Sequence, residues 1–377
     1  MDRRMLHHIM LVICTVLAPS LGLAAGHPPD DATRAAEQRI FADSGAHGMV
    51  IAIVDGDSVS VNGYGETRPG SKTLPDAHSL LRIGSLSKLL AVDLMVKLAS
   101  QGSLRLTDPL QRYAPNGERV PSSSRPITLI DLATHTSGLP RQANIAPDTR
   151  TPYTQARWAW LQGQNTLSAP GHTALYSNLG FDLLADALGE AAQMPYDQAL
   201  QHYVTQPLGM RDTTDAPSAG QCARLMSGDN AHMSCAAQRD NAGSGGMYST
   251  AADMVAWMQQ QLGLGESGID PQTAISQAIY FQRQSLADVQ GMDNGGRAAG
   301  LGMGWVMLSA SGQGTAILEK TGGFGGFMSY VALAPGRQAG VFVAVTRMDL
   351  PMLQTLAKQV NALVSTLAKA DAHHHPS

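Results

Sequence analysis

A serine and a lysine three residues apart open the most apolar helix that the sequence predicts. Ser85 and Lys88 follow a short apolar run at residues 80–83, which stops at Gly84. A helix beginning at or just after Ser85 and ending at Gly102 would be buried on nearly every side. Residues three apart share a helix face, so the two side chains would lie within hydrogen-bond reach. Burial and the helix N-terminus both favour a neutral lysine, which could take the proton of a serine hydroxyl.

This pair alone is weak evidence, because a chain of 377 residues contains about one Ser-x-x-Lys by chance. A second polar group lies at Tyr176 and Asn178, between the turn at residues 170–171 and a predicted helix that starts near Leu179. Taken alone, Tyr176 would be interpreted as a packing residue at a helix boundary. A catalytic role for Tyr176 is indicated only when it is considered together with the other polar groups.

A third group is Lys320-Thr321-Gly322-Gly323, at the end of a predicted strand. Glycines at this place would let the backbone of a substrate lie against the strand edge. The alternative for Lys320 is an ordinary solvated charge at a strand end. The sequence therefore offers a nucleophile with its base, a tyrosine and a cation, spread over more than 230 residues.

The elements that must position these groups come from both ends of the chain. Strands are predicted at residues 48–54 and 58–64, joined by Asp55-Gly56-Asp57, which is a hairpin signal. Further strands are predicted at residues 301–308, 315–320, 327–334 and 340–347. The region between, from Ser85 to Gly209, is mostly helical, and Ser249 caps another helix. We expect one antiparallel sheet with a helical block inserted into it and Ser85 at the junction.

The last predicted helix is apolar on one face between residues 353 and 367, and has few lysines, so we expect it to pack on the sheet and not on a membrane. The whole forms a single domain at residues 30–370. Its α/β part would comprise residues 30–84 and 245–370, its mainly helical part residues 85–244, and residues 371–377 a flexible tail.

The N-terminus predicts export. Arg3 and Arg4 precede an apolar run at residues 9–17, and small residues follow, so residues 1–25 resemble a cleaved signal peptide. The apolar run is too short and too broken by Pro19 to be a membrane span. The net charge is −4 with both signs scattered, so no basic patch for nucleic acid is expected.

Two cysteines, Cys222 and Cys235, remain after removal of the leader, which contains Cys14. Two cysteines close in the sequence of an exported protein form a disulfide more often than a metal site. Closing so short a loop stabilises a fold by about 3 kcal/mol.

The three polar groups, in this order, resemble the triple signature of penicillin-binding proteins and class C β-lactamases. More narrowly, the chain resembles the AmpH-type D-alanyl-D-alanine carboxypeptidase/endopeptidases over nearly its whole mature length. The stretches that carry this resemblance lie at residues 64–70, 132–140, 181–188, 207–210, 221–222, 243–250 and 301–306. The resemblance implies an α+β fold of the β-lactamase/transpeptidase type, with helices flanking an antiparallel sheet and a cleft beside an inserted helical subdomain.

The same resemblance implies catalytic roles for three residues. Ser85 would be the acylated nucleophile and Lys88 its base. Tyr176 would pass a proton to the leaving amine and help to activate water for deacylation. Other residues would bind the substrate: Asn178 its amide, and Lys320 and Thr321 its terminal carboxylate.

The backbone N–H groups of Ser85 and Gly323 would form the oxyanion hole, in which each donor is worth about 3 kcal/mol. Gly322 belongs to the same binding strand. Class C β-lactamases usually carry Ser or Ala at the place of Gly323, so this departure predicts weak β-lactam hydrolysis at most.

The expected activity is that of a periplasmic serine DD-peptidase, both carboxypeptidase and endopeptidase, acting on peptidoglycan stem peptides and binding β-lactams. The alternatives are a class C β-lactamase, an esterase or D-amino-acid peptidase of the same fold, and a non-catalytic β-lactam sensor. No Gly-x-Ser-x-Gly or His-Glu-x-x-His motif is present, and no metal or cofactor is expected. The sequence leaves open peripheral association with the inner membrane and the oligomeric state.

Overall fold

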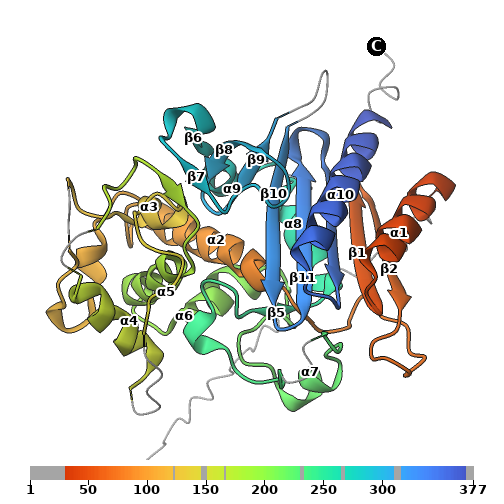
Figure 1. Cartoon of the computed structure of the whole chain (residues 1–377), viewed down its shortest axis with the longest axis horizontal. Helices are drawn as coiled ribbons and strands as arrows, with labels where there is room; N and C mark the ends of the chain where they lie inside the picture. Colours follow the sequence, from red (N-terminus) through yellow and green to blue (C-terminus); the bar gives the residue numbers. More distant parts are fainter. Residues whose placement is uncertain are drawn as a thin grey trace, which may run out of the picture.

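An eight-stranded antiparallel sheet lies at the centre of the computed structural model, which describes residues 30–121, 124–145, 151–164, 167–229, 233–264, 268–309 and 316–370 (Figure 1). The strand order is β2-β1-β12-β11-β10-β9-β8-β6. The strands are β1 (Gly48–Asp55), β2 (Ser58–Gly65), β6 (Ile279–Gln282), β8 (Ala298–Gly302), β9 (Val306–Leu308), β10 (Ile317–Phe324), β11 (Phe327–Ala334) and β12 (Ala339–Val345). The predicted signal peptide and the predicted tail lie outside the described residues.

Strands from the two ends of the chain meet in this sheet, as predicted. β1 pairs with β12 in an antiparallel register that places Met49 opposite Val345. β1 also pairs with β2, and the two-residue turn between them contains Gly56 with a positive φ of 53°. The hairpin prediction is therefore confirmed, because a left-handed residue is what such a tight turn requires.

Helices cover both faces of the sheet. Met49 and Ile51 of β1 pack with apolar side chains of α1 and α10, and Val50 and Ala52 pack with those of α2, α5 and α8. This alternation follows from the two-residue period of a strand. The packing of the last helix on the sheet is confirmed, and Figure 1 shows α1 and α10 side by side on the face away from the helical block.

The helices are α1 (Asp31–Ser44), α2 (Ser87–Ser100), α3 (Leu129–Ala133), α4 (Tyr153–Gln162), α5 (Asn178–Ala192), α6 (Tyr196–Leu200), α7 (Ala219–Ala223), α8 (Ala251–Gln261), α9 (Pro271–Gln277) and α10 (Leu350–Ala370). Short 3₁₀ turns are η1 (Gly84–Leu86), η2 (Leu110–Tyr113), η3 (Pro115–Gly117), η5 (Arg239–Asn241), η6 (Arg283–Ser285) and η7 (Pro335–Arg337), and η4 (Gln201–Thr205) is a π-helical turn. Two small sheets pair β3 (Leu81–Arg82) with β5 (Tyr248–Ser249) and β4 (Ala174–Leu175) with β7 (Val289–Gln290). The predicted boundary between an α/β part and a helical part stays a prediction.

The structure corrects three details of the predicted elements. The strand predicted at residues 301–308 is two strands, β8 and β9, because the chain reverses at Gly304, whose φ is 73°. The edge strand β6 was not predicted. The N-cap of α8 is Thr250, whose side chain accepts from the N–H of Asp253, and the predicted cap Ser249 ends β5. Among the described helices, none is long and apolar enough to cross a membrane.

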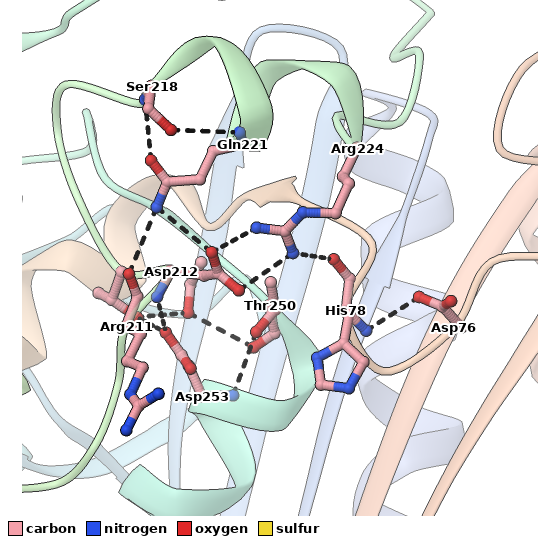
Figure 2. Close-up of polar contacts among 11 residues, drawn as sticks. Asp76, His78, Arg211, Asp212, Ser218, Gln221, Arg224, Thr250 and Asp253 are labelled. Carbon is pink, nitrogen blue, oxygen red and sulfur yellow. Dashed lines mark hydrogen bonds and ion pairs between the residues drawn. The ribbon is translucent and has the colours of Figure 1, made fainter.

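A polar network holds the segment around α7 against the strand that leads to Ser85 (Figure 2). Arg224 forms a bidentate ion pair with Asp212 and also donates to the carbonyl oxygen of His78 at 2.6 Å. The backbone N–H of Asp212 donates to the carboxylate of Asp253 on α8 at 2.8 Å. The backbone N–H of Leu80 donates to the carbonyl oxygen of Arg224 at 2.9 Å. These contacts hold in place residues 78–80, which lead through β3 to the turn that carries Ser85.

The predicted disulfide between Cys222 and Cys235 is confirmed, with the two Cα atoms 5.7 Å apart. The bond joins α7, which contains Cys222, to Cys235, the residue after Ser234. The carbonyl oxygen of Ser234 accepts a hydrogen bond of 2.7 Å from the buried guanidinium of Arg82, three residues before the nucleophile. The disulfide therefore lies one contact away from the strand that positions Ser85.

Candidate active site

Ser85 lies in the 3₁₀ turn η1, directly before α2, and hydrogen bonds from two other segments hold Ile83, the residue that precedes the turn. The N–H of Ile83 donates to the carbonyl oxygen of Met247 at 3.1 Å, and the hydroxyl of Ser329 donates to the carbonyl oxygen of Ile83 at 2.8 Å. Gly84 has a φ of 53°, and a Cβ atom there would lie 2.5 Å from the backbone nitrogen of Gly323. Only glycine fits this conformation and this close approach of η1 to β10.

Lys88 is fully buried and reaches three oxygen atoms. Its Nζ lies 3.1 Å from Ser85 Oγ, 2.8 Å from Asn178 Oδ1 and 2.5 Å from the carbonyl oxygen of Ser244. The last two oxygens can only accept hydrogen bonds, so they take the two hydrogens of a neutral amine. The remaining position on the nitrogen, the lone pair, then faces Ser85 Oγ.

The pKa of Lys88 is lowered to about 7, chiefly by burial; Asp182 opposes this shift, and Arg141 acts in the same direction as burial. The direction agrees with the one expected from the sequence, and its cause is desolvation of the ammonium. A lysine with such a pKa is half neutral near pH 7, and this is the form that accepts a proton.

Tyr176 approaches the nucleophile from the other side. Its hydroxyl donates to Ser85 Oγ at 2.6 Å. Three basic side chains lie over its ring: Lys88 Nζ, Lys320 Nζ and Arg141 Cζ are each 4.8 Å from the ring centroid. The interpretation of Tyr176 as a mere packing residue does not fit this geometry, since its hydroxyl contacts the predicted nucleophile.

His135 packs behind the Tyr176 ring and was not singled out from the sequence. The two ring centroids are 4.6 Å apart, and His135 Nδ1 accepts from the N–H of Ser177 at 3.0 Å. Burial lowers the pKa of His135 well below its usual value, and Lys320, Lys88 and Arg141 add to this. The imidazole is therefore neutral, and it holds Tyr176 in place. The backbone of His135 has a φ of 61°, which is rare for a residue other than glycine, and such conformations cluster at functional sites.

Lys320 is buried beside the ring of Tyr176 and is only 2% exposed. The alternative of a solvated strand-end charge is therefore wrong. Burial lowers the pKa of Lys320, with Lys88 and Arg141 acting in the same direction and Tyr176 and Glu319 against it. Lys320 lies in the middle of β10, which runs on to Phe324, so the predicted strand end at residue 320 is too early.

The two glycines after Thr321 differ in the room around them. A Cβ atom on Gly322 would overlap Ser329 Oγ and the carbonyl oxygen of Ile83, whereas a Cβ atom on Gly323 would meet Met328 Sδ at 3.1 Å. Gly322 therefore permits the contact between β10 and η1. Through this contact, the backbone nitrogen of Gly323 comes next to the turn that carries Ser85.

The structure brings together five of the predicted side chains, namely Ser85, Lys88, Tyr176, Asn178 and Lys320, and Thr321 follows Lys320 on β10. Four groups near the site were not predicted from the sequence: the carbonyl oxygen of Ser244 and the side chains of Arg141, His135 and Asp182. Among the described residues, no cluster of His, Cys, Asp and Glu could hold a metal ion.

Comparisons with known proteins agree with this geometry. A family model described as "Beta-lactamase" matches residues 33–365. The chain is 44% identical to the D-alanyl-D-alanine-carboxypeptidase/endopeptidase AmpH of Escherichia coli K12, over 87% of each chain.

Solved structures match as well. A crystal structure of a β-lactamase/D-alanine carboxypeptidase from Yersinia pestis is 43% identical and superposes with a TM-score of 0.83, covering 90% of this chain and 99% of that one. A class C β-lactamase from Rhodobacter sphaeroides, 23% identical, shares the fold with a TM-score of 0.72 over 89% of this chain and 99% of that one. The expected fold class is thus confirmed, and the chain belongs to the β-lactamase family of serine hydrolases.

Proposed function

We propose that the protein is a serine DD-peptidase that cleaves D-Ala-D-Ala ends and cross-links of peptidoglycan stem peptides through an acyl-enzyme on Ser85. The observation that carries the proposal is the arrangement around Ser85 Oγ. Lys88 Nζ lies 3.1 Å away with its other two directions taken by carbonyl oxygens, and the Tyr176 hydroxyl lies 2.6 Å away. The similarity to carboxypeptidases in two bacteria supports the same substrate class.

The reaction follows from these positions. Ser85 Oγ attacks the carbonyl carbon of the penultimate D-Ala while its proton passes to Lys88 Nζ. The backbone N–H groups of Ser85 and Gly323 hold the oxyanion. Tyr176 gives a proton to the amine of the departing D-Ala, and the C–N bond breaks to leave an ester. Water then attacks the ester carbon and gives its proton to the Tyr176 oxygen, and Lys88 returns a proton to Ser85 Oγ as the ester C–O bond breaks, so that all three side chains regain their starting state.

Lys320 gives the site a cation for the terminal carboxylate of the substrate, with Thr321 as a second donor. Charge-assisted hydrogen bonds of this kind are roughly twice as strong as neutral ones. A β-lactam presents a similarly placed carboxylate, so β-lactams are expected to acylate Ser85. Asn178, held by Lys88, is positioned to donate its amide N–H₂ group to the substrate backbone.

Export to the periplasm belongs to the same proposal. The leader-like composition of residues 1–25 and the Cys222–Cys235 disulfide both support it, because disulfides persist in oxidising compartments.

The proposal is tested by measuring kcat/KM for a stem pentapeptide, a cross-linked dimer and a cephalosporin with one enzyme preparation. We expect both peptides to be cleaved and the cephalosporin to acylate quickly but hydrolyse slowly. Hydrolysis of the cephalosporin orders of magnitude faster, with neither peptide cut, would identify a β-lactamase instead.

Replacing Lys320 with methionine should remove the preference for a free carboxylate. Methionine keeps the buried volume but not the charge, and a hydrogen bond to a charged group contributes about 1.5–3 kcal/mol. We expect kcat/KM for a peptide ending in D-Ala to fall roughly 10- to 100-fold, while the value for the same peptide with an amidated end changes little. The exposed Lys358 on α10 provides the control variant, Lys358→Met. An equal fall for the acid and the amide would refute the role of Lys320.

A further inference from the structure

A buried carboxyl group lies behind the proposed base, and the mechanism above does not use it. Asp182 is on α5, one turn after Asn178, and is 2% exposed. Its Oδ1 atom is buried and has no hydrogen-bond partner among the described residues. Acidic side chains are almost never fully buried unless they are paired, so Asp182 calls for a partner charge.

Ser244 connects this carboxyl group to Lys88. Its carbonyl oxygen accepts from Lys88 Nζ at 2.5 Å, and its side chain lies beside the carboxyl group of Asp182, whose pKa it lowers. The backbone around Ser244 is pressed onto α5, because a Cβ atom on Gly243 would lie 2.5 Å from the carbonyl oxygen of Phe181 and 2.6 Å from Ala185 Cβ. One residue thus contacts both groups, and its position is fixed by close packing on the helix that carries Asp182.

The charges around the two groups make Asp182 the negative partner of Lys88. Among the described residues that interact electrostatically with Lys88, Arg141 and Lys320 are cations and His135 is neutral, which leaves Asp182 as the negative group. Two other helices present titratable groups to Asp182: α4 presents Arg157 and Tyr153, and α6 presents Tyr196. Asp186 lies one turn further along α5 itself. Arg157 is already occupied, since it pairs with Asp186 and donates to the carbonyl oxygen of Asp240.

We propose that Asp182 is a positioning residue that supplies the buried negative charge for the Lys88 ammonium formed when Ser85 gives up its proton. This inference rests on the proposed function. As the bond from Ser85 Oγ to the carbonyl carbon forms, the hydroxyl proton moves to Lys88 Nζ, and the Asp182 carboxylate balances the new charge without changing any bond of its own. Without it, burial and the neighbouring cations would leave Lys88 too weak a base.

The electrostatics support this assignment. Burial raises the pKa of Asp182 to about 7, against the opposing effects of Arg157, Ser244 and Lys88, and burial lowers the pKa of Lys88 to about the same value. Each group therefore influences the charge of the other in the pH range where the enzyme would work. Because a carboxylate raises the pKa of a nearby lysine, its removal must lower that pKa.

The test is the pH profile, from pH 5 to 9, of the rate constant for acylation of Ser85 by a fluorescent penicillin. In the unchanged protein, the rate should rise through a midpoint near pH 7 as Lys88 loses its proton. In Asp182→Asn, we expect the midpoint to move down by about 1–3 pH units, and the plateau to fall about 10-fold because a weaker base accepts the proton less readily. A merely structural role would lower the plateau and leave the midpoint in place.

The matched control is Asp186→Asn, which removes a charge from the next turn of the same helix. It breaks the pair with Arg157 and reaches Lys88 only through Asp182, so the midpoint should move far less than in Asp182→Asn. If Asp182→Asn does not fold, Asp182→Ser is the second variant. The chain has six lysines, so NMR with ¹³Cε-labelled lysine can also follow the titration of Lys88 directly, assigned by the signal that Lys88→Met loses.

An unchanged midpoint in both Asp182 variants would overturn the inference and leave the proposed function intact. Failure of the unchanged protein to acylate at Ser85 would instead overturn the proposed function, before any variant is compared.

Discussion

Replacing Lys88 with methionine is expected to slow acylation of Ser85 by roughly 10²- to 10⁴-fold, the usual contribution of a general base. Lys88 Nζ lies 3.1 Å from Ser85 Oγ and has its two other directions taken by Asn178 Oδ1 and the carbonyl oxygen of Ser244. Methionine fills the same buried space but cannot accept the proton. The measurement is the second-order rate constant for labelling by a fluorescent penicillin.

Lys97→Met is the matched control, because Lys97 lies on the same helix but far from the nucleophile, in the last turn of α2. Its rate constant should equal that of the unchanged protein. Labelling of Lys88→Met at an unaltered rate would mean that another group takes the serine proton, and Tyr176 would then be the only proposed residue left in contact with Ser85 Oγ.

Replacing Gly322 with alanine is expected to destabilise the fold and the site together. The new Cβ atom would overlap Ser329 Oγ and the carbonyl oxygen of Ile83, and would come within 3.0 Å of Leu86 Cδ1. The first two atoms belong to the hydrogen bond that joins β11 to the approach of η1, so neither can move freely. Overpacking of this kind costs about 1–3 kcal/mol. We expect this loss in the free energy of unfolding by urea, together with a large fall in the acylation rate.

Gly323→Ala is the control for this substitution. There the nearest atom is Met328 Sδ at 3.1 Å, the end of a flexible side chain, so a small shift makes room. This variant should keep its stability to within about 1 kcal/mol. If both variants were equally stable and equally active, the close approach of β10 to η1 would not be what places the oxyanion hole.

The local parts of the site could be predicted from the sequence, because their geometry is set by helix spacing. Ser85 and Lys88 are three residues apart, and the almost wholly apolar composition of α2 indicated that Lys88 would be buried. The amphipathic pattern of α10 likewise indicated which face packs on the sheet. Such patterns depend only on neighbours within a few turns.

The missed parts depend on contacts between distant segments. Ser244 contacts Lys88 across 156 residues, and it does so through a backbone carbonyl, which every residue has. His135 contributes through a left-handed backbone conformation and a stacked ring, and neither is visible in the type of residue alone. The strand β6 is four residues long, and such a short apolar run fits a helix or a strand equally well.

Asp182 illustrates the limit most clearly. In the sequence, it is one of several acidic residues in an apolar helix, at a spacing from Asn178 that places both on one face. That spacing alone does not show that the carboxyl group is buried beside the site, and it does not identify its partner. The partner becomes visible only when the segment around Ser244 is packed between α5 and α2.

The central claim is an acyl-enzyme on Ser85, and the most direct test is mass spectrometry of protein acid-quenched during turnover of a stem pentapeptide that ends in D-Ala-D-Ala. The account predicts an adduct with the mass of the peptide acyl group without its terminal D-Ala, located by proteolysis on the peptide that contains Ser85 and absent from Ser85→Ala. An adduct on another residue, or undiminished cleavage of the pentapeptide by Ser85→Ala, would contradict it.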